Sequence, residues 1–130
     1  MSAVDQAGTA ERVADVVLDA AHEIRRLQAE RRGGAADREN PTGDEVIAAD
    51  VAADEYLVDR LAAIDGVGAV ASEERAEVAD AGEGLSVAVD PLDGSSNLAV
   101  NAPTGTILGV YEDDLPAPGR SLVAAAMVVY

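Results

Sequence analysis

The chain has 130 residues and a formal net charge of −16 at pH 7, from 25 acidic and 9 basic side chains. This length is enough for one small domain with its own core. The strong negative charge disfavours nucleic acid and anionic membranes as partners. The absence of cysteine excludes disulfide bridges and zinc sites built on thiolates.

The basic residues are all arginine, and alanine and valine are abundant. An acid-rich, lysine-free composition resembles that of salt-loving archaea, although a GC-rich genome biases a chain in a similar way. The amino terminus has no basic-then-apolar signal, and no apolar run approaches the ~18 residues that indicate a membrane span. The chain is therefore predicted to be cytoplasmic.

Residues 1–8 are predicted to form a flexible tail, and Thr9 is predicted to cap a first helix that runs to about Arg32. Gly33 and Gly34 are expected to end this helix. Its apolar side chains recur at helical spacing and are expected to face the core: Val13, Val16, Val17, Ala20, Ala21, Ile24 and Leu27.

A polar loop is predicted at 33–43, followed by a second helix over about 44–64. Thr42 and Glu45 have the spacing of a capping box at its start. Asp50 and Asp54 are four residues apart, so the helix places them on one face.

After Gly66 the helical pattern gives way to short apolar runs that are typical of buried strands. Strands are expected at 67–71, 85–89, 106–111 and 122–130, and a helical turn at 97–100. Two helices followed by strands predict an α+β, layered fold for residues 9–130. The last apolar run stops at Tyr130 without a turn signal, so this portion is expected to be truncated in mid-strand.

The main chemical signal is the segment from Asp90 to Asn97, which directly follows an apolar run. Its two aspartates leave the strand three residues apart, and Pro91 and Gly94 favour a sharp change of direction. Gly94, Ser95 and Ser96 can present amides and hydroxyls to a phosphate. Hard oxygen donors side by side suit magnesium or manganese.

A second acidic pair, Glu73 and Glu74, also follows an apolar run, and Asp50 can add a third carboxylate. Cations would be needed to hold so many negative charges together. Each feature alone has a plainer interpretation. Asp-Gly-Ser-Ser is ordinary turn chemistry, the glutamates fit a charged surface, and Asp50 fits a solvated helix face.

Two other kinds of site do not fit this segment. A calcium loop with Gly94 at its sixth position would need acids in place of Val89 and Pro91. An aspartyl-phosphate enzyme would carry two aspartates one residue apart, whereas Asp90 and Asp93 are three apart.

The segment from Asp90 to Asn97 resembles the signature of the lithium-sensitive, metal-dependent phosphatase superfamily. Its two serines, where inositol monophosphatases usually have two threonines, resemble class 1 fructose-1,6-bisphosphatase. Further segments are similar to that family: Asn40-Pro41-Thr42-Gly43-Asp44 leading to Asp50, Ser72-Glu73-Glu74, and Asn101 followed by Gly105-Thr106-Ile107.

This resemblance implies a layered α/β sugar phosphatase that is homo-oligomeric when full length. It implies that two or more Mg²⁺ ions, or Mn²⁺, are held by carboxylates and one backbone carbonyl: Glu73, Asp90, Asp93 and the carbonyl of Leu92. Asp93, Gly94, Ser95 and Ser96 would bind the substrate phosphate. Asp50 and Glu74 would position and deprotonate the attacking water.

The implied reaction is hydrolysis of the 1-phosphate of fructose 1,6-bisphosphate in gluconeogenesis. Members of this family are about twice as long, and their second half supplies another metal ligand and the sugar pocket. The chain alone is therefore expected to have weak activity or none. The alternatives are an inositol monophosphatase or nucleotide 3'-phosphatase, and a non-catalytic metal-binding or interaction domain.

Overall fold

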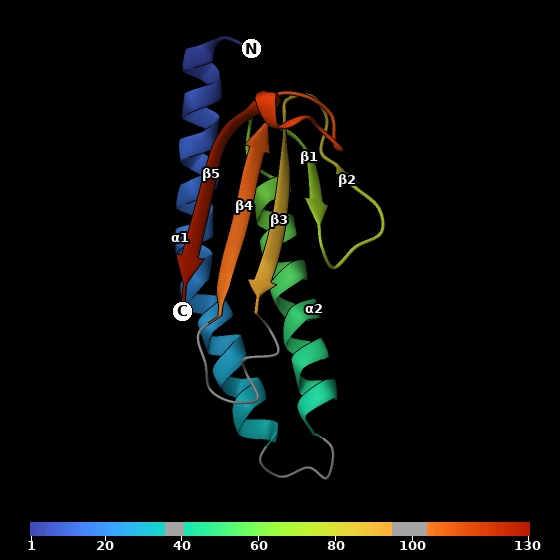
Figure 1. Cartoon of the computed structure of the whole chain (residues 1–130). Coiled ribbons are helices and arrows are strands. Elements are labelled where there is room, and N and C mark those ends of the chain that lie inside the picture. The colour runs from blue at the N-terminus through green and yellow to red at the C-terminus, as the bar shows by residue number, and fades with distance from the viewer. Residues whose placement is uncertain (36–40, 95–103) are drawn as a thin grey trace.

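The computed structural model describes the backbone of residues 1–35, 41–94 and 104–130, and the side chains of these residues apart from 28–50. Within this part of the chain, two long helices lie side by side against one face of a twisted sheet of five strands (Figure 1). The predicted layered arrangement of helices and sheet is confirmed. In the described residues no helix is both long and apolar enough to cross a membrane.

Helix α1 spans Ala3–Ala35, so the predicted tail of residues 1–8 and the predicted cap at Thr9 are wrong. Ser2 caps the helix instead, because its hydroxyl oxygen accepts the amide of Asp5 at 3.1 Å while the Asp5 carboxylate accepts the Ser2 hydroxyl at 2.8 Å. Thr9 is buried about two turns further on. The helix also passes through Gly33 and Gly34, where the sequence predicted its end.

Helix α2 spans Pro41–Ala62, close to the predicted 44–64. The predicted capping box of Thr42 and Glu45 lies outside the described side chains. Both helices turn an apolar stripe toward the sheet, and these side chains are almost completely buried: Val13, Val17, Ala20 and Ile24 from α1, and Ala53, Leu57, Val58 and Leu61 from α2.

The strands follow the predicted apolar runs. They are β1 (Val67–Ser72), β3 (Leu85–Asp93), β4 (Gly105–Tyr111) and β5 (Leu122–Val129), with a 3₁₀ turn at Gly119–Ser121. The two-residue strand β2 (Ala79–Asp80) was not predicted, because a strand this short has no alternating pattern. The predicted helical turn at 97–100 lies outside the described residues.

The strand order is β2-β1-β3-β4-β5. Strands β1 and β3 are parallel, and the other neighbours are antiparallel. Alternate side chains therefore face the helices or the opposite side of the sheet. On that opposite side, which no described element covers, β4 and β5 expose Ile107 and its cross-strand partner Met127.

The turn into β1 depends on a close approach at Gly66. Its φ is +95°, and a Cβ built on it would lie 2.3 Å from the hydroxyl oxygen of Thr9. Arg12 links the same elements, since its guanidinium donates to the Thr9 hydroxyl and to the carbonyl of Asp65, both at 3.0 Å. Helix α1 is therefore seated directly on the start of the sheet.

We expect Gly66→Ala to lower the free energy of unfolding by more than about 2 kcal/mol, because it adds both backbone strain and a clash with Thr9. Urea denaturation at fixed salt would measure this loss. Gly82→Ala is the matched control for strain alone, since Gly82 has a φ of +114° and nothing within 4 Å of its would-be Cβ. Equal losses for both variants would contradict the close packing at Gly66.

Candidate metal centre

The register of β1 and β3 places two acidic segments next to each other. These strands are parallel, so both end at the same edge of the sheet, and Ser72 is paired with Val89. The pairing continues one step further, because the Glu73 amide donates to the Val89 carbonyl at 3.1 Å. Glu73 therefore follows β1 at the level where Asp90 lies on β3.

A tight turn after β1 presents the two glutamates to solvent. Ser72 is buried, and its hydroxyl oxygen accepts the Glu74 amide at 3.2 Å. Its carbonyl accepts the Arg75 amide at 3.1 Å. A serine with this side-chain bond is a local alternative to continued strand pairing, so the chain leaves the sheet here and Glu73 and Glu74 are both exposed.

Strand β3 contains a β-bulge between its two aspartates. Asp90 is opposite Ile107 and Asp93 is opposite Gly105, so β3 has one residue more than β4 over this stretch. Opposed residues of an antiparallel pair share a face, and Ile107 and Gly105 are two apart. The bulge thus directs Asp90 and Asp93 to the same side of the sheet, although three residues separate them.

Hydrogen bonds from β4 and β5 hold this bulge. The Thr106 hydroxyl, which is fully buried, donates to the Pro91 carbonyl at 2.7 Å and lies 2.6 Å from the Tyr130 hydroxyl. Burial raises the pKa of Tyr130 above its usual value, so its hydroxyl stays protonated and can donate to Thr106. Pro91 itself has no amide to contribute, which suits its place in the bulge.

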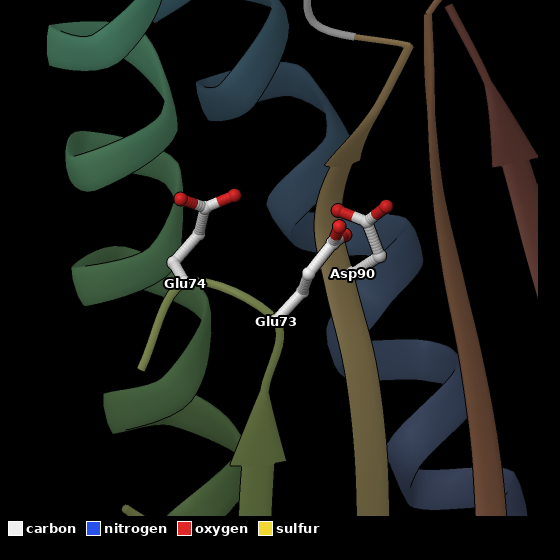
Figure 2. A group of neighbouring side chains, drawn as sticks. All are labelled: Glu73, Glu74 and Asp90. Carbon is white, nitrogen blue, oxygen red and sulfur yellow. The ribbon is translucent and has the colours of Figure 1, made fainter. Parts of the chain in front are cut away.

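Together these elements gather three carboxylates. Glu73, Glu74 and Asp90 each have a carboxylate oxygen within 4.8 Å of the others. Figure 2 shows Glu73 beside Asp90, with Glu74 on the far side of Glu73 along the same turn. The glutamates are exposed and Asp90 is half-buried, so the group is open to solvent on one side.

The crowding changes the acidity of Asp90. Its pKa is raised to about 6, first by burial and then by hydrogen bonding with Glu73 and the negative charge of Glu73. The Leu92 amide, which donates to Asp90 Oδ1 at 3.2 Å, and Asp93 act in the opposite direction and lower this pKa. In the absence of a cation and below about pH 6, a proton therefore takes the place of a positive charge in this site.

The donor set fits a divalent cation. Three carboxylates can neutralise and chelate a small hard ion, which prefers oxygen ligands. The raised pKa of Asp90 is consistent with this fit, because burial, and after it the hydrogen bond and the negative charge of Glu73, disfavour a charged carboxylate that no cation balances. Exposed acids also gather without a metal, so the fit depends on Asp90 and its half-buried position more than on the two glutamates.

The other predicted site residues are placed less completely. Asp93 is exposed and interacts with Asp90, but it is not part of the three-carboxylate group. Leu92 is buried, and Gly94 turns the chain with a φ of +75°. Asp50 lies in α2, but its side chain is outside the described part, as are Ser95 and Ser96 altogether.

Comparison with known proteins identifies the family of the chain. A family model described as "Fructose-1-6-bisphosphatase, N-terminal domain" matches residues 13–130. The chain belongs to the fructose-1,6-bisphosphatase family. Membership implies the use of a divalent metal, and the group of Glu73, Glu74 and Asp90 has the oxygen donors to bind one.

Curated members of the fructose-1,6-bisphosphatase family extend well beyond this chain. The class 1 enzyme of Halobacterium salinarum is 50% identical over 121 residues, which cover 91% of the chain and 42% of that protein. The class 1 enzyme of Natronomonas pharaonis is 52% identical over 120 residues, with the same coverage of 91% and 42%. The chain thus spans less than half the length of these relatives.

A solved structure supports the fold. The chain is similar to the crystal structure of Leishmania major fructose-1,6-bisphosphatase in holo form, with a TM-score of 0.64 and 24% identity. The match covers 91% of the chain and 40% of the solved one. At this identity the likeness concerns the fold of the two helices and the sheet.

The raised pKa of Asp90 predicts how the metal-free protein responds to pH. The folded state retains this proton up to about pH 6, whereas the ordinary value is 3.8. The folded state thus binds more protons over this window, and the site's contribution to stability falls as pH rises from about 4 to above 6. Asp90→Asn should remove that fall, and so gain stability relative to wild type as pH increases.

Urea denaturation of both proteins with chelator at constant high salt would measure this difference. Glu77→Gln removes one acid from the exposed segment that follows the turn and is the matched control. A stability difference between wild type and Asp90→Asn that stays constant from pH 4 to 7 would contradict the raised pKa.

Proposed function

We propose that the chain is the amino-terminal part of a magnesium-dependent enzyme that hydrolyses the 1-phosphate of fructose 1,6-bisphosphate. The observation that carries this proposal is the group of Glu73, Glu74 and Asp90 at one edge of the sheet, within a chain of this family. The relatives bear the name of that activity. Water would add to the phosphorus as the bond to the sugar oxygen breaks, which gives fructose 6-phosphate and inorganic phosphate.

The proposed roles divide the acidic residues by position. Glu73, Asp90, Asp93 and the Leu92 carbonyl would hold two or more Mg²⁺ ions, with Mn²⁺ as a possible substitute. Bound there, the ions would polarise the phosphate and favour ionisation of the attacking water. Below about pH 6, Asp90 would then lose the proton that it retains in their absence.

Glu74, on the side of the three-carboxylate group away from Asp90, is the proposed proton acceptor. Glu74 is exposed and at the outer end of the three-carboxylate group, so it can accept a proton from a water molecule that approaches from solvent. Asp50 is proposed to assist it from α2. The substrate phosphate would be bound by Asp93, Gly94, Ser95 and Ser96.

The wider setting of the proposal follows from family membership. The substrate would be a sugar bisphosphate, the reaction a step of gluconeogenesis in the cytoplasm, and the full-length enzyme a homo-oligomer. Nucleic acid and membranes are not proposed as partners, because the net charge of −16 repels polyanions.

The hollow on the uncovered face of the sheet is not proposed as the sugar site. It has a volume of about 600 Å³ and reaches Glu73 and Asp90, but most of its wall is apolar, with Ala88, Ile107 and Leu122 among the lining residues. A sugar phosphate needs polar partners for its hydroxyls. The described residues do not supply them there.

A chimaera tests the proposed activity. The chain would replace the matching 42% of the Halobacterium salinarum relative, and phosphate release from fructose 1,6-bisphosphate would be followed with Mg²⁺ at high salt. We expect turnover that stops when Mg²⁺ is chelated. Glu74→Gln should lower kcat by about 100-fold or more, because it removes the proposed proton acceptor.

Glu77→Gln is the matched control in the same exposed segment and should leave turnover unchanged. Turnover of an inositol phosphate or a nucleotide 3'-phosphate in place of the bisphosphate would favour the alternative phosphatases. A folded chimaera that binds Mg²⁺ but hydrolyses none of these substrates would favour a non-catalytic metal-binding domain.

We also propose that the chain is adapted to high salt. Its 25 acidic residues face 9 basic ones, and aspartates gather on the described surface, as where Asp15, Asp19 and Asp65 border one hollow. Their mutual repulsion opposes folding unless ions screen it. Relatives at 44 to 52% identity come from Halobacterium, Haloarcula and Natronomonas.

Lowering the salt from about 1 M to about 0.01 M increases the Debye length, the distance over which charges interact, from about 3 to about 30 Å. We therefore expect the helical circular dichroism signal and the thermal midpoint both to fall. A thermal midpoint that is independent of salt would refute the adaptation.

A further inference from the structure

A partly buried ion pair connects the glutamate turn to α2. Arg75 directly follows Glu73 and Glu74, and its Nε lies 2.6 Å from Oδ2 of Asp54 in α2. The Asp54 side chain is 6% exposed and that of Arg75 is 34% exposed. The two residues are 21 positions apart, so the pair is a tertiary link and not a local turn contact.

We propose that Asp54 and Arg75 are positioning residues, whose ion pair fixes the Glu73-Glu74 turn relative to α2. This inference rests on the proposed metal-binding role of the turn. The hydrogen bonds of Ser72 set the internal shape of the turn, and the bond from Glu73 to Val89 ties it to β3. The ion pair adds a third attachment of the turn, to α2.

The pair is better suited to positioning than to stability. Burying two charges costs about as much as their attraction returns, and apolar residues of similar size often serve stability equally well. The cost here is increased because Asp54 Oδ1 is buried and has no hydrogen-bond partner among the described residues. What the pair provides is a fixed anchor point, since the short bond from Nε to the buried Oδ2 of Asp54 limits where the Arg75 guanidinium, and so the turn that carries it, can lie.

The pair also controls the charge of Arg75. Its guanidinium is attached next to the glutamates, and without Asp54 it could turn toward them and compete with a cation for the same oxygens. Bound to Asp54, it is neutralised on the helix side of the turn. Asp54 also lies one helical turn after position 50 on α2, so the pair sets the distance between the turn and that part of the helix.

Amide hydrogen exchange of the metal-free 130-residue chain tests positioning without any metal. The amides of Glu73, Glu74 and Arg75 each have a hydrogen bond that a fixed turn protects. We expect Arg75→Gln and Asp54→Asn to raise exchange at these amides by about 10-fold or more, with the amides of β4 and β5 unchanged. Glu55→Gln, at an exposed neighbour on α2, is the matched control and should change neither set.

The second measurement is Mn²⁺ affinity by calorimetry at high salt. Each single variant should weaken binding about 10-fold or more, as is typical of residues that orient metal ligands. Arg75→Lys, which keeps a cation for Asp54, should recover part of this affinity. The double variant Asp54→Asn/Arg75→Gln should bind Mn²⁺ more tightly than Asp54→Asn alone, because no arginine is left to compete.

The possible outcomes separate the two proposals. If wild type binds no Mn²⁺, the metal role of the site fails, while the exchange data still decide whether the pair fixes the turn. Faster exchange spread evenly over the sheet, or unchanged exchange at all three amides, would overturn the positioning role. If a single variant does not fold, amide exchange of the uncharged double variant, compared with that of Arg75→Lys, decides the positioning role instead.

Discussion

The parallel pairing of β1 with β3 is the constraint on which the candidate metal centre depends. Two acidic segments that are well separated in sequence, Glu73-Glu74 and the one that begins at Asp90, meet because the two strands run in parallel to the same edge, with Ser72 level with Val89. Side chains alternate along a strand, so a shift of one residue in β3 would turn Asp90 toward the helices and bury it in the apolar core. The core residues Val87 and Val89 hold the register that keeps Asp90 on the other face.

This arrangement brings like charges together before any cation binds. The fold bears that cost because the apolar contacts of both helices with the sheet fix the backbone on either side of the site. Protonation of Asp90 is the simplest relief available to the metal-free chain, and it accounts for a carboxyl whose pKa is raised to about 6. Cation binding and proton release are therefore two sides of one equilibrium.

The sequence was sufficient to predict the two apolar strands that bring Glu73 and Asp90 to one edge of the sheet, because each acid directly follows an apolar run or its last serine. It did not predict that β3 continues past 89 to Asp93, so that Asp90 lies within the strand. It did not predict the bulge that directs Asp93 to the side of Asp90, because bulges depend on pairing with β4. The ion pair of Asp54 with Arg75 was also missed. Asp54 could be placed on a helix face, but the position of the turn against that face is a tertiary property.

The error at Thr9 has a similar cause. A threonine before an apolar helical pattern predicts a cap, yet Thr9 is buried where Gly66 leaves room for it, and Ser2 caps the helix. The packing of α1 on the start of β1 therefore outweighed the local preference of threonine for a helix N-cap. That contact lies at the opposite end of β1 from Glu73. The two ends of this short strand thus differ in what fixes them: close packing of Gly66 on Thr9 with the hydrogen bonds of Arg12 at one end, and hydrogen bonds with an ion pair at the glutamate turn.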